Sequence, residues 1–230
     1  MIEYIVPGNI DDRILAKAAK LLENGGIVAI PTDTSWNIVC SMNSQEGIKR
    51  LRAISKERDE SHFTLLCSDI SQFQEFCSLD TSRFRLIKRL TPGPYVFILK
   101  THLGTEKALG LRRKEIGVRL PDYPVPLALI NALGCPLYGV TAKKNMTQTG
   151  EDPELEEHYS TEHSSDDQNS DVSVPSEETL FEGGWELEDI QGLDLIMDPG
   201  EDRNRIYSTV LDLGSGEVQV LRQGAGHWPA

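Results

Sequence analysis

Two stretches of the chain place apolar residues at the spacing of an amphipathic helix. The first covers residues 10–23, where five apolar residues from Ile14 to Leu22 share one face. Gly25 follows at a position where helices often end. The second stretch begins after Ser44, a good N-cap, and places three apolar residues on one side and basic residues on the other. We therefore expect a helix at each stretch.

Short runs of β-branched and aromatic residues between Gly, Pro and polar residues predict buried strands. They cover residues 27–30, 38–40, 63–67, 95–100, 116–120 and 137–141, and then 208–213 and 218–221. After the acidic segment, order is expected to resume at residues 187–190 and 193–197. Further helices are expected over residues 71–77, 81–90 and 124–133. Because helices alternate with strands over the first 140 residues, the pattern favours an α/β (α+β) single domain with a largely buried mixed sheet.

The strand expected over residues 27–30 runs into a polar turn that is a candidate binding site. Pro31 has no N–H to donate, so we expect it to end the ladder. Thr32, Asp33 and Thr34 follow, and two hydroxyls and a carboxylate on a stiff turn can build a small-molecule site. The same residues are also typical of an ordinary Asx or Ser/Thr turn, and this stretch alone does not decide between the two.

The formal charge of −13 belongs to one segment rather than to the whole chain. Residues 151–190 carry 15 of the 36 acidic residues and no Lys or Arg, which leaves 23 basic and 21 acidic residues elsewhere. A Ser-, Glu- and Asp-rich segment cannot bury enough apolar surface to offset its ordering entropy. We therefore expect one domain formed by residues 1–149 and 187–230, with an acidic, disordered insert over 150–186. The charge does not argue against nucleic acid as a partner.

The cysteines and the hydropathy exclude several classes of protein. The four cysteines show no C-x-x-C and no His-rich spacing, so we expect no metal site. No apolar run approaches the length of a signal peptide or of a membrane span. We therefore expect a cytoplasmic protein with reduced thiols and no membrane partner.

Hydroxyls and cations recur just after predicted strands or helix ends. Such a set suits an anionic ligand such as a nucleoside triphosphate, because phosphate oxygens pair with Arg, Lys and hydroxyl donors. Neither glycine-rich phosphate-loop motif occurs. Taken singly, each residue is also consistent with a solvated charge or a structural hydroxyl. The candidates are Thr32, Thr34, Lys56, Arg58, His62, Arg119, Thr141, Lys143, Ser208 and Arg222.

The order of six motifs resembles the YrdC/YciO family, which includes the threonylcarbamoyl-AMP synthases. The motifs are Gly-Gly-x-x-x-x-Pro-Thr-Asp-Thr, Lys-x-Arg, Thr-Pro-Gly-x-x-x-x-x-Leu, Gly-Val-Arg-x-Pro, Ser-Thr-Val-x-Asp and Leu-Arg-x-Gly. The resemblance covers residues 10–141 and 193–224, and the sequences of residues 63–67 and 95–100 are closer to the YciO branch. It implies a YrdC-like single domain whose twisted sheet has a concave, positively charged face.

The resemblance also implies a reaction. L-Threonine takes up bicarbonate to give a carbamate, which attacks the α-phosphate of ATP, releases pyrophosphate and leaves threonylcarbamoyl-AMP for modification of tRNA adenosine 37. Mg²⁺ would be held mainly by the phosphates. By motif, the substrate-binding residues would be Thr32, Thr34, Arg119 and Ser208. The catalytic residues would be Lys56 and Arg58, and the nucleotide-binding residues Arg58, His62, Thr141, Lys143 and Arg222.

The sequence departs from the synthases where they bind ATP. Their Ser-x-Asn motif is replaced by Thr141-Ala142-Lys143, which keeps a hydroxyl and gains a charge but loses the amide. Two hypotheses follow: a threonylcarbamoyl-AMP synthase, or a YciO-type paralogue that binds double-stranded RNA, tRNA or a nucleotide without that chemistry. An ATP-dependent enzyme with another acceptor is a third, because Trp36 and His62 reshape the amino-acid pocket.

Overall fold

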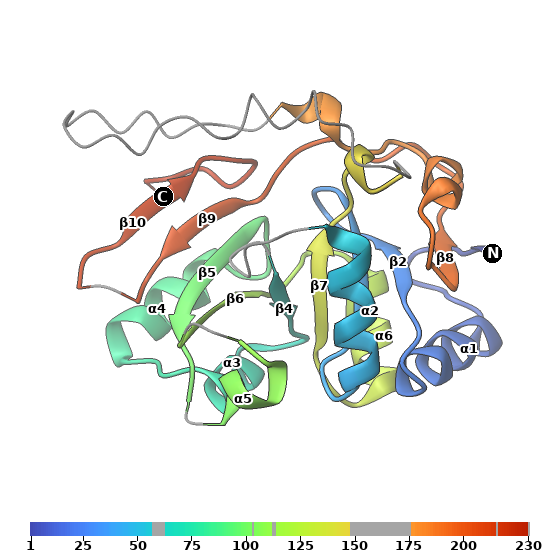
Figure 1. The fold of residues 1–230 in the computed structure, drawn as a ribbon. Helices are drawn as coiled ribbons and strands as arrows, with labels where there is room; N and C mark the ends of the chain where they lie inside the picture. Colours follow the sequence, from blue (N-terminus) through green and yellow to red (C-terminus); the bar gives the residue numbers. More distant parts are fainter. Residues whose placement is uncertain (57–62, 103, 112–113, 148–175, 215, 230) are drawn as a thin grey trace.

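The computed structural model of the protein describes residues 1–56, 63–102, 104–111, 114–147, 176–214 and 216–229. Within these ranges the strands form one ten-stranded sheet in the order β1-β8-β2-β3-β7-β4-β6-β5-β9-β10 (Figure 1). The strands are β1 (Ile2–Tyr4), β2 (Val28–Pro31), β3 (Trp36–Ser41), β4 (Thr64–Leu66), β5 (Tyr95–Lys100), β6 (Glu115–Arg119), β7 (Leu137–Thr141), β8 (Leu195–Asp198), β9 (Thr209–Asp212) and β10 (Gln219–Arg222).

The sheet is mixed. Parallel pairs join β1 and β2 to β8, β4 to β6, and β5 to β9, while the remaining neighbours are antiparallel. Of the three strands that follow the acidic stretch, β8 and β9 pair with strands from the first half of the chain, and β10 pairs with β9. The prediction of a mixed, largely buried sheet is confirmed, and the chain's two halves share one sheet.

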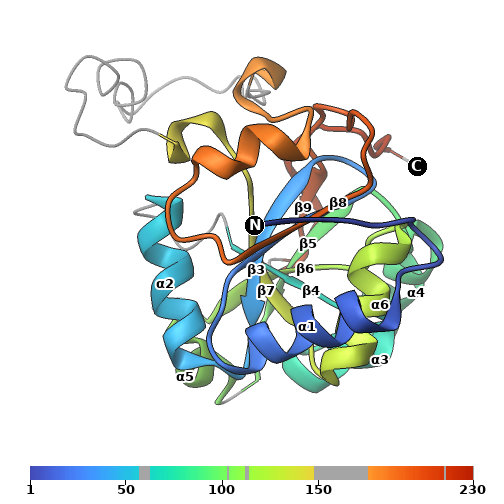
Figure 2. The ribbon, with the colours of Figure 1, turned by 90° about the vertical axis from the view of Figure 1, so that its right-hand side faces the viewer.

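Six helices flank the sheet in the described ranges: α1 (Asp12–Glu23), α2 (Gln45–Ser55), α3 (Ile70–Phe76), α4 (Thr81–Leu90), α5 (Thr105–Leu109) and α6 (Pro124–Leu133). Figure 2 shows α1 and α6 on one side of the central strands and α2 on the other. Alternate residues of β2 face the two sides: Val28 and Ile30 pack in the apolar cluster of α1 and α6, and Ala29 packs in the larger cluster that includes α2. In the described ranges, no helix combines the length and apolar character of a membrane span.

Most element bounds follow the periodicity, and the exceptions have local causes. The expected bounds of α4, α6, β5 and β7 are confirmed residue by residue. Pro31 ends the ladder, as expected, but it does so as the last residue of β2, paired with Trp36, since the last residue of a strand needs no further donor. Helix α5 was not expected, because its five residues are too few to show a helical period.

Part of the segment that was expected to be a disordered insert forms 3-10 turns with buried side chains. The insert was expected to extend to residue 186, and residues 148–175 lie outside the described residues. From Glu177 onward the chain forms 3-10 turns, and Leu180 and Phe181 are buried. The apolar pair anchors this stretch, although its neighbours are acidic.

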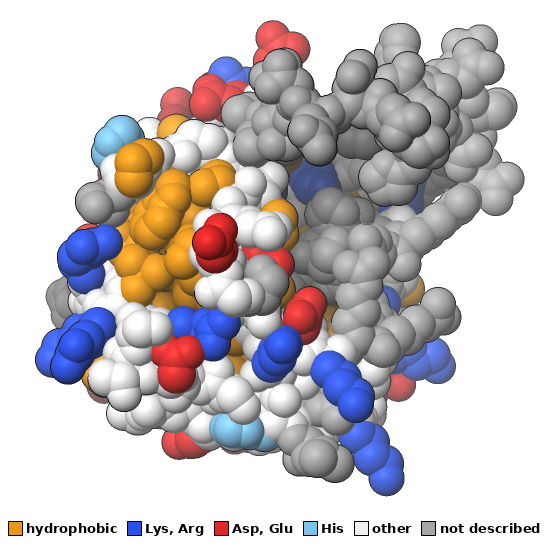
Figure 3. All heavy atoms as spheres, turned by 90° about the vertical axis from the view of Figure 1, so that its left-hand side faces the viewer, with side chains coloured by type: hydrophobic (Ala, Val, Ile, Leu, Met, Phe, Trp, Pro, Cys, Tyr) orange, Lys and Arg blue, Asp and Glu red, His pale blue; other side chains and the backbone are white. Residues whose placement is uncertain are grey.

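The two edges of the sheet differ from its centre in exposure. Figure 3 views the molecule from the side of β10, where hydrophobic side chains gather and Lys and Arg side chains lie around them. Val218 and Leu221, in and beside the edge strand β10, are large exposed hydrophobic residues. The candidate site lies on one face of the sheet and extends from β3 to the edge strand β10.

Candidate functional site

A hollow on the sheet collects residues from seven strands, from the segment after β7 and from the segment before β9. Its floor is apolar, from Leu66, Val96, Ile98, Val140 and Val210. Alternation along β5 produces this floor: Val96 and Ile98 face the hollow, whereas Phe97 and Leu99 pack in the core behind it. The polar lining residues are Asn37, Thr64, Arg119, Thr141, Lys143, Tyr207, Ser208 and Arg222.

The most buried polar group is a cluster of Thr34, Arg119 and Ser208, which we call the inner cluster. Arg119, the last residue of β6, donates from Nη1 to Oγ1 of Thr34 over 3.0 Å. The same Thr34 oxygen lies 3.4 Å from Oγ of Ser208. Between 1% and 6% of each residue is exposed. The structure thus brings together three candidate residues that lie 85 and 174 positions apart in sequence.

The turn after β2 fixes Thr34 through the hydroxyl of Thr32. This hydroxyl donates to the Ser35 carbonyl over 2.7 Å and accepts from the amides of Thr34 and Ser35 at 3.2 and 3.3 Å. The segment therefore forms a Ser/Thr turn, which was one of the two alternatives that the sequence left open. The same turn holds Thr34 where Arg119 can donate to its hydroxyl. Thr32 contributes to the site through this scaffold.

A buried ion pair holds Arg119 in place. Its Nη2 lies 2.5 Å from Oδ1 of Asp33, and the exposed fractions of the two side chains are 3% and 13%. Burial lowers the pKa of the Arg119 guanidinium, and the charge of Asp33 opposes that shift. An arginine remains charged under these conditions. Nε of Arg119 and Oδ2 of Asp33 are buried and have no hydrogen-bond partner among the described residues.

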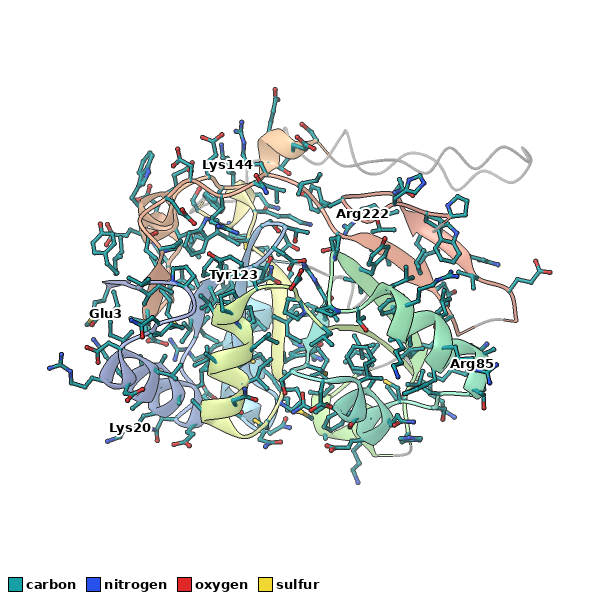
Figure 4. The ribbon with its side chains drawn as sticks, turned by 180° about the vertical axis from the view of Figure 1, so that it is seen from behind. Glu3, Lys20, Arg85, Tyr123, Lys144 and Arg222 are labelled. Carbon is teal, nitrogen blue, oxygen red and sulfur yellow. The ribbon has the colours of Figure 1, made fainter. Side chains whose placement is uncertain are left out.

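Thr141, Lys143 and Arg222 form an outer cluster that is half-buried. Arg222 donates from Nε to the Ser208 carbonyl over 3.0 Å, and its guanidinium lies 4.8 Å from the centre of the Tyr207 ring. Burial lowers the pKa of Arg222, and the charge of Arg119 contributes in the same direction. Figure 4 labels Arg222 at the sheet edge beside this face. Two cations and a hydroxyl at one end of a hollow fit an anion with several oxygens.

The structure places Lys56 apart from this hollow. Lys56 lies in a second hollow with Arg50, Ile54 and Met146, at the end of α2. Its Nζ donates to the carbonyl of Asn145 over 3.3 Å, and its backbone is left-handed with φ of 53°. Lys56 is not among the residues that line the first hollow, contrary to its expected grouping with the other candidates. Arg58 and His62 lie outside the described residues.

Three polar lining residues were missed as candidates. Asn37 in β3, Thr64 and Tyr207 line the hollow, but none of them was among the sequence candidates. Asn37 and Thr64 lie in β3 and β4, and Tyr207 lies just before β9. A polar residue at a single alternate position was the signal that could have identified them.

Metal ligands do not form a cluster in the part of the chain that the structure describes: no three His, Cys, Asp or Glu side chains come together. The lining of the hollow there is cationic and neutral, without a carboxylate. Such a lining fits a metal ion that arrives bound to phosphates better than one held by the protein itself.

The fold and the site together define an α/β protein with a cationic hollow on the face of a mixed sheet. The chain belongs to the Sua5/YciO/YrdC family, whose model, described as telomere recombination, matches residues 20–162. The resemblance drawn from the motifs is therefore confirmed.

Individual relatives place the chain nearer to YciO than to the synthases. An uncharacterised protein of Haemophilus influenzae is 31% identical over 97% of this chain and 95% of its own length. The uncharacterised protein YciO of Escherichia coli is 36% identical over 58% of this chain and 66% of its own. A threonylcarbamoyl-AMP synthase of Vibrio vulnificus is 25% identical over 56% of this chain and 70% of its own.

Solved structures agree on the fold. The crystal structure of E. coli YciO has a TM-score of 0.78 and 28% identity, and covers 100% of this chain and 98% of that one. The structure of P. abyssi Sua5 complexed with L-threonine has a TM-score of 0.75 and 20% identity, and covers 97% of this chain and 57% of that one. The predicted YrdC-like fold is confirmed.

Proposed function

We propose that this protein forms threonylcarbamoyl-AMP from L-threonine, bicarbonate and ATP, for modification of tRNA adenosine 37. The observation that carries the proposal is that Arg119 and Ser208, both in contact with Thr34, line one hollow together with Thr141, Lys143 and Arg222. A family member named as a synthase and a Sua5 structure with bound L-threonine support it.

The inner cluster is suited to the carboxylate of L-threonine. Arg119 is fixed by Asp33 and Thr34, and its buried Nε has no hydrogen-bond partner among the described residues. A carboxylate oxygen at that atom would satisfy it, and the hydroxyls of Thr34 and Ser208 are close enough to share the ligand. The geometry is set before the ligand arrives, which lowers the entropy cost of binding.

The outer cluster is suited to the phosphates of ATP. Lys143 and Arg222 supply two positive charges, and Thr141 supplies a hydroxyl. The apolar floor of Val96, Ile98 and Val210 gives a neutral surface between the clusters. Lys143 and Arg222 would hold the phosphates that carry Mg²⁺, and the ion would supply charge neutralisation there.

The chemistry requires alignment more than proton transfer. A carbamate oxygen forms a bond to the α-phosphorus, the bond from that phosphorus to the bridging oxygen breaks, and pyrophosphate carries away the electron pair. The chain's part is to hold the carbamate at the inner cluster and to stabilise phosphoryl charge with Arg222 and Lys143. From the motif match we propose that Arg58 and His62, which lie outside the described residues, act on the bicarbonate-derived oxygens or the nucleotide. Lys56 lies in the second hollow and takes no part in this proposal.

Pyrophosphate release tests the proposal. With the purified protein, ATP and Mg²⁺, we expect release only when L-threonine and bicarbonate are both present, together with a new adenylate seen by mass spectrometry. Arg58→Ala should abolish it, while Arg85→Ala, on α4, should not. Release that ignores threonine, or no release at any ATP concentration, would reject synthase activity.

The second candidate is a YciO-type paralogue that binds double-stranded RNA, tRNA or a nucleotide without this chemistry. Lys143 favours it, because a lysine stands where the synthases carry the asparagine of their ATP motif. The identity to YciO, 36% against 25% for the synthase, supports it as well.

Salt dependence separates the two candidates. A binding protein should hold RNA without threonine, with an affinity that falls steeply as salt rises, because counterions are released from the phosphates. Filter binding of a tRNA over a series of salt concentrations measures this slope. RNA affinity that is undetectable at low salt removes the RNA part of the second candidate.

A further inference from the structure

Arg203 reaches the back of the turn that carries Thr34. Its side chain is 12% exposed, and Nη2 donates to the carbonyl of Thr32 over 2.8 Å, across 171 residues of sequence. This carbonyl belongs to the residue whose hydroxyl shapes the turn. Arg203 does not line the hollow, so its contact with the site runs through the backbone of the Thr32–Thr34 turn.

The same guanidinium also touches the segment that carries Arg119. Its central carbon lies 4.4 Å from the centre of the Tyr123 ring, a cation–π contact. Tyr123, labelled in Figure 4, is the N-cap residue of α6 and follows Arg119 closely in the chain. Arg203 therefore contacts both segments whose side chains, Asp33 and Arg119, form the buried ion pair.

Arg203 is itself held from the other side. Its Nη1 pairs with Glu201 over 3.1 Å, and its backbone N–H donates to the Glu182 carbonyl over 2.9 Å. A planar guanidinium can donate to a carbonyl in its plane and stack on a ring with its face at the same time, which an ammonium cannot. The arginine is thus a clamp with a fixed orientation.

We propose that Arg203 is a positioning residue: it locks the Thr32–Thr34 turn against the segment after β6 and so sets the distance between Thr34 and Arg119. Because it rests on the proposed function, the inference assigns to Arg203 part of the affinity for the amino-acid carboxylate. The ligand itself touches only the inner cluster.

Arg205 is a matched control. It is also an arginine in the same segment, but it pairs with Glu182 over 2.8 Å, and its side chain is 36% exposed, against 12% for Arg203. Calorimetry of L-threonine binding should show Arg203→Ala weakened by about tenfold, the loss typical of one charged hydrogen bond with a stacking contact. Arg203→Lys should recover part of it, and Arg205→Ala should match wild type. ATP affinity should stay the same in all three.

Amide hydrogen exchange tests the clamp without any ligand. The amides of Thr34 and Ser35 both donate to the Thr32 hydroxyl, so they report on the turn. In Arg203→Ala they should exchange faster, while the amides of β3 keep their rate and show that the fold is intact. Arg205→Ala should leave all of these rates unchanged.

The two readouts separate the possible failures. If wild type does not bind L-threonine, the proposed function fails, and faster exchange in Arg203→Ala alone still upholds the clamp. If the amides of Thr34 and Ser35 exchange at the wild-type rate in Arg203→Ala, Arg203 does not clamp the turn, and the proposal is overturned. Faster exchange with unchanged L-threonine affinity overturns the positioning role, since Arg203 would then serve the fold only.

Discussion

The inner and outer clusters of the hollow are built differently. In the inner cluster, side chains bond to one another: Arg119 to Thr34 and Asp33, and Thr34 to Ser208. In the outer cluster, Arg222 bonds to a backbone carbonyl and stacks on Tyr207, and the lining is half-buried. The first arrangement fixes distances, and the second supplies charge. A ligand with one end of defined shape and one end of diffuse negative charge fits this contrast.

Removing the guanidinium of Arg119 should have the largest effect. Arg119→Ala leaves Asp33 buried without its partner, so we expect a loss of about 3–5 kcal/mol in the free energy of unfolding. Urea denaturation measures it, and L-threonine binding should vanish as well. The double variant with Asp33→Ala should recover part of the stability. A loss of under about 1 kcal/mol would show that the ion pair is not buried as described.

Arg222 tests the outer cluster. Arg222→Ala should weaken ATP binding by about 1.5–3 kcal/mol, the value of a hydrogen bond to a charged group, with a much smaller change for L-threonine. Calorimetry with each ligand separately measures both. Equal weakening of the two ligands would mean that the clusters do not divide the ligand as we propose.

Ser208 tests whether the hydroxyl of the inner cluster contributes to binding. Ser208→Ala removes one neutral hydrogen bond, so we expect about 1 kcal/mol, or a fivefold loss, in L-threonine affinity. Ser82→Ala, on α4, serves as the control. ATP affinity should not move, and a larger effect on ATP than on L-threonine would reverse the assignment.

The smallest expected effect is at Lys143. Lys143→Asn replaces a charge by the amide of the synthases, so nucleotide affinity should change little at high salt and fall at low salt, where charge attraction is least screened. A titration of ATP at several salt concentrations measures it. If salt dependence is the same in both proteins, the charge of Lys143 is not used by the nucleotide.

Local signals in the sequence predicted much of the fold. The helices over residues 81–90 and 124–133 appear as expected, because their caps and periodicity are contained within the segments. The order of the strands could not be derived this way. The pairing of β5 with β9, for example, joins Tyr95 to Thr209 and depends on contacts that no local pattern encodes.

Some residues of the site could be selected from the sequence, and others depend on contacts between distant segments. Thr34, Arg119 and Ser208 were selected by type and by motif, and the structure brings them together. Lys56 was selected on the same grounds and lies in another hollow, because the direction of a side chain at a helix end depends on the following chain. Arg203 gave no signal, since its contact with Thr32 spans 171 residues.

The central claim is that the inner cluster recognises a carboxylate, and calorimetry with L-threonine and L-threoninamide tests it most directly. The two ligands differ only in that group. We predict that L-threonine binds and that the amide binds at least about fiftyfold more weakly, because the amide presents no negatively charged oxygen to Arg119. Equal affinity for the two, or binding of neither, would contradict the account.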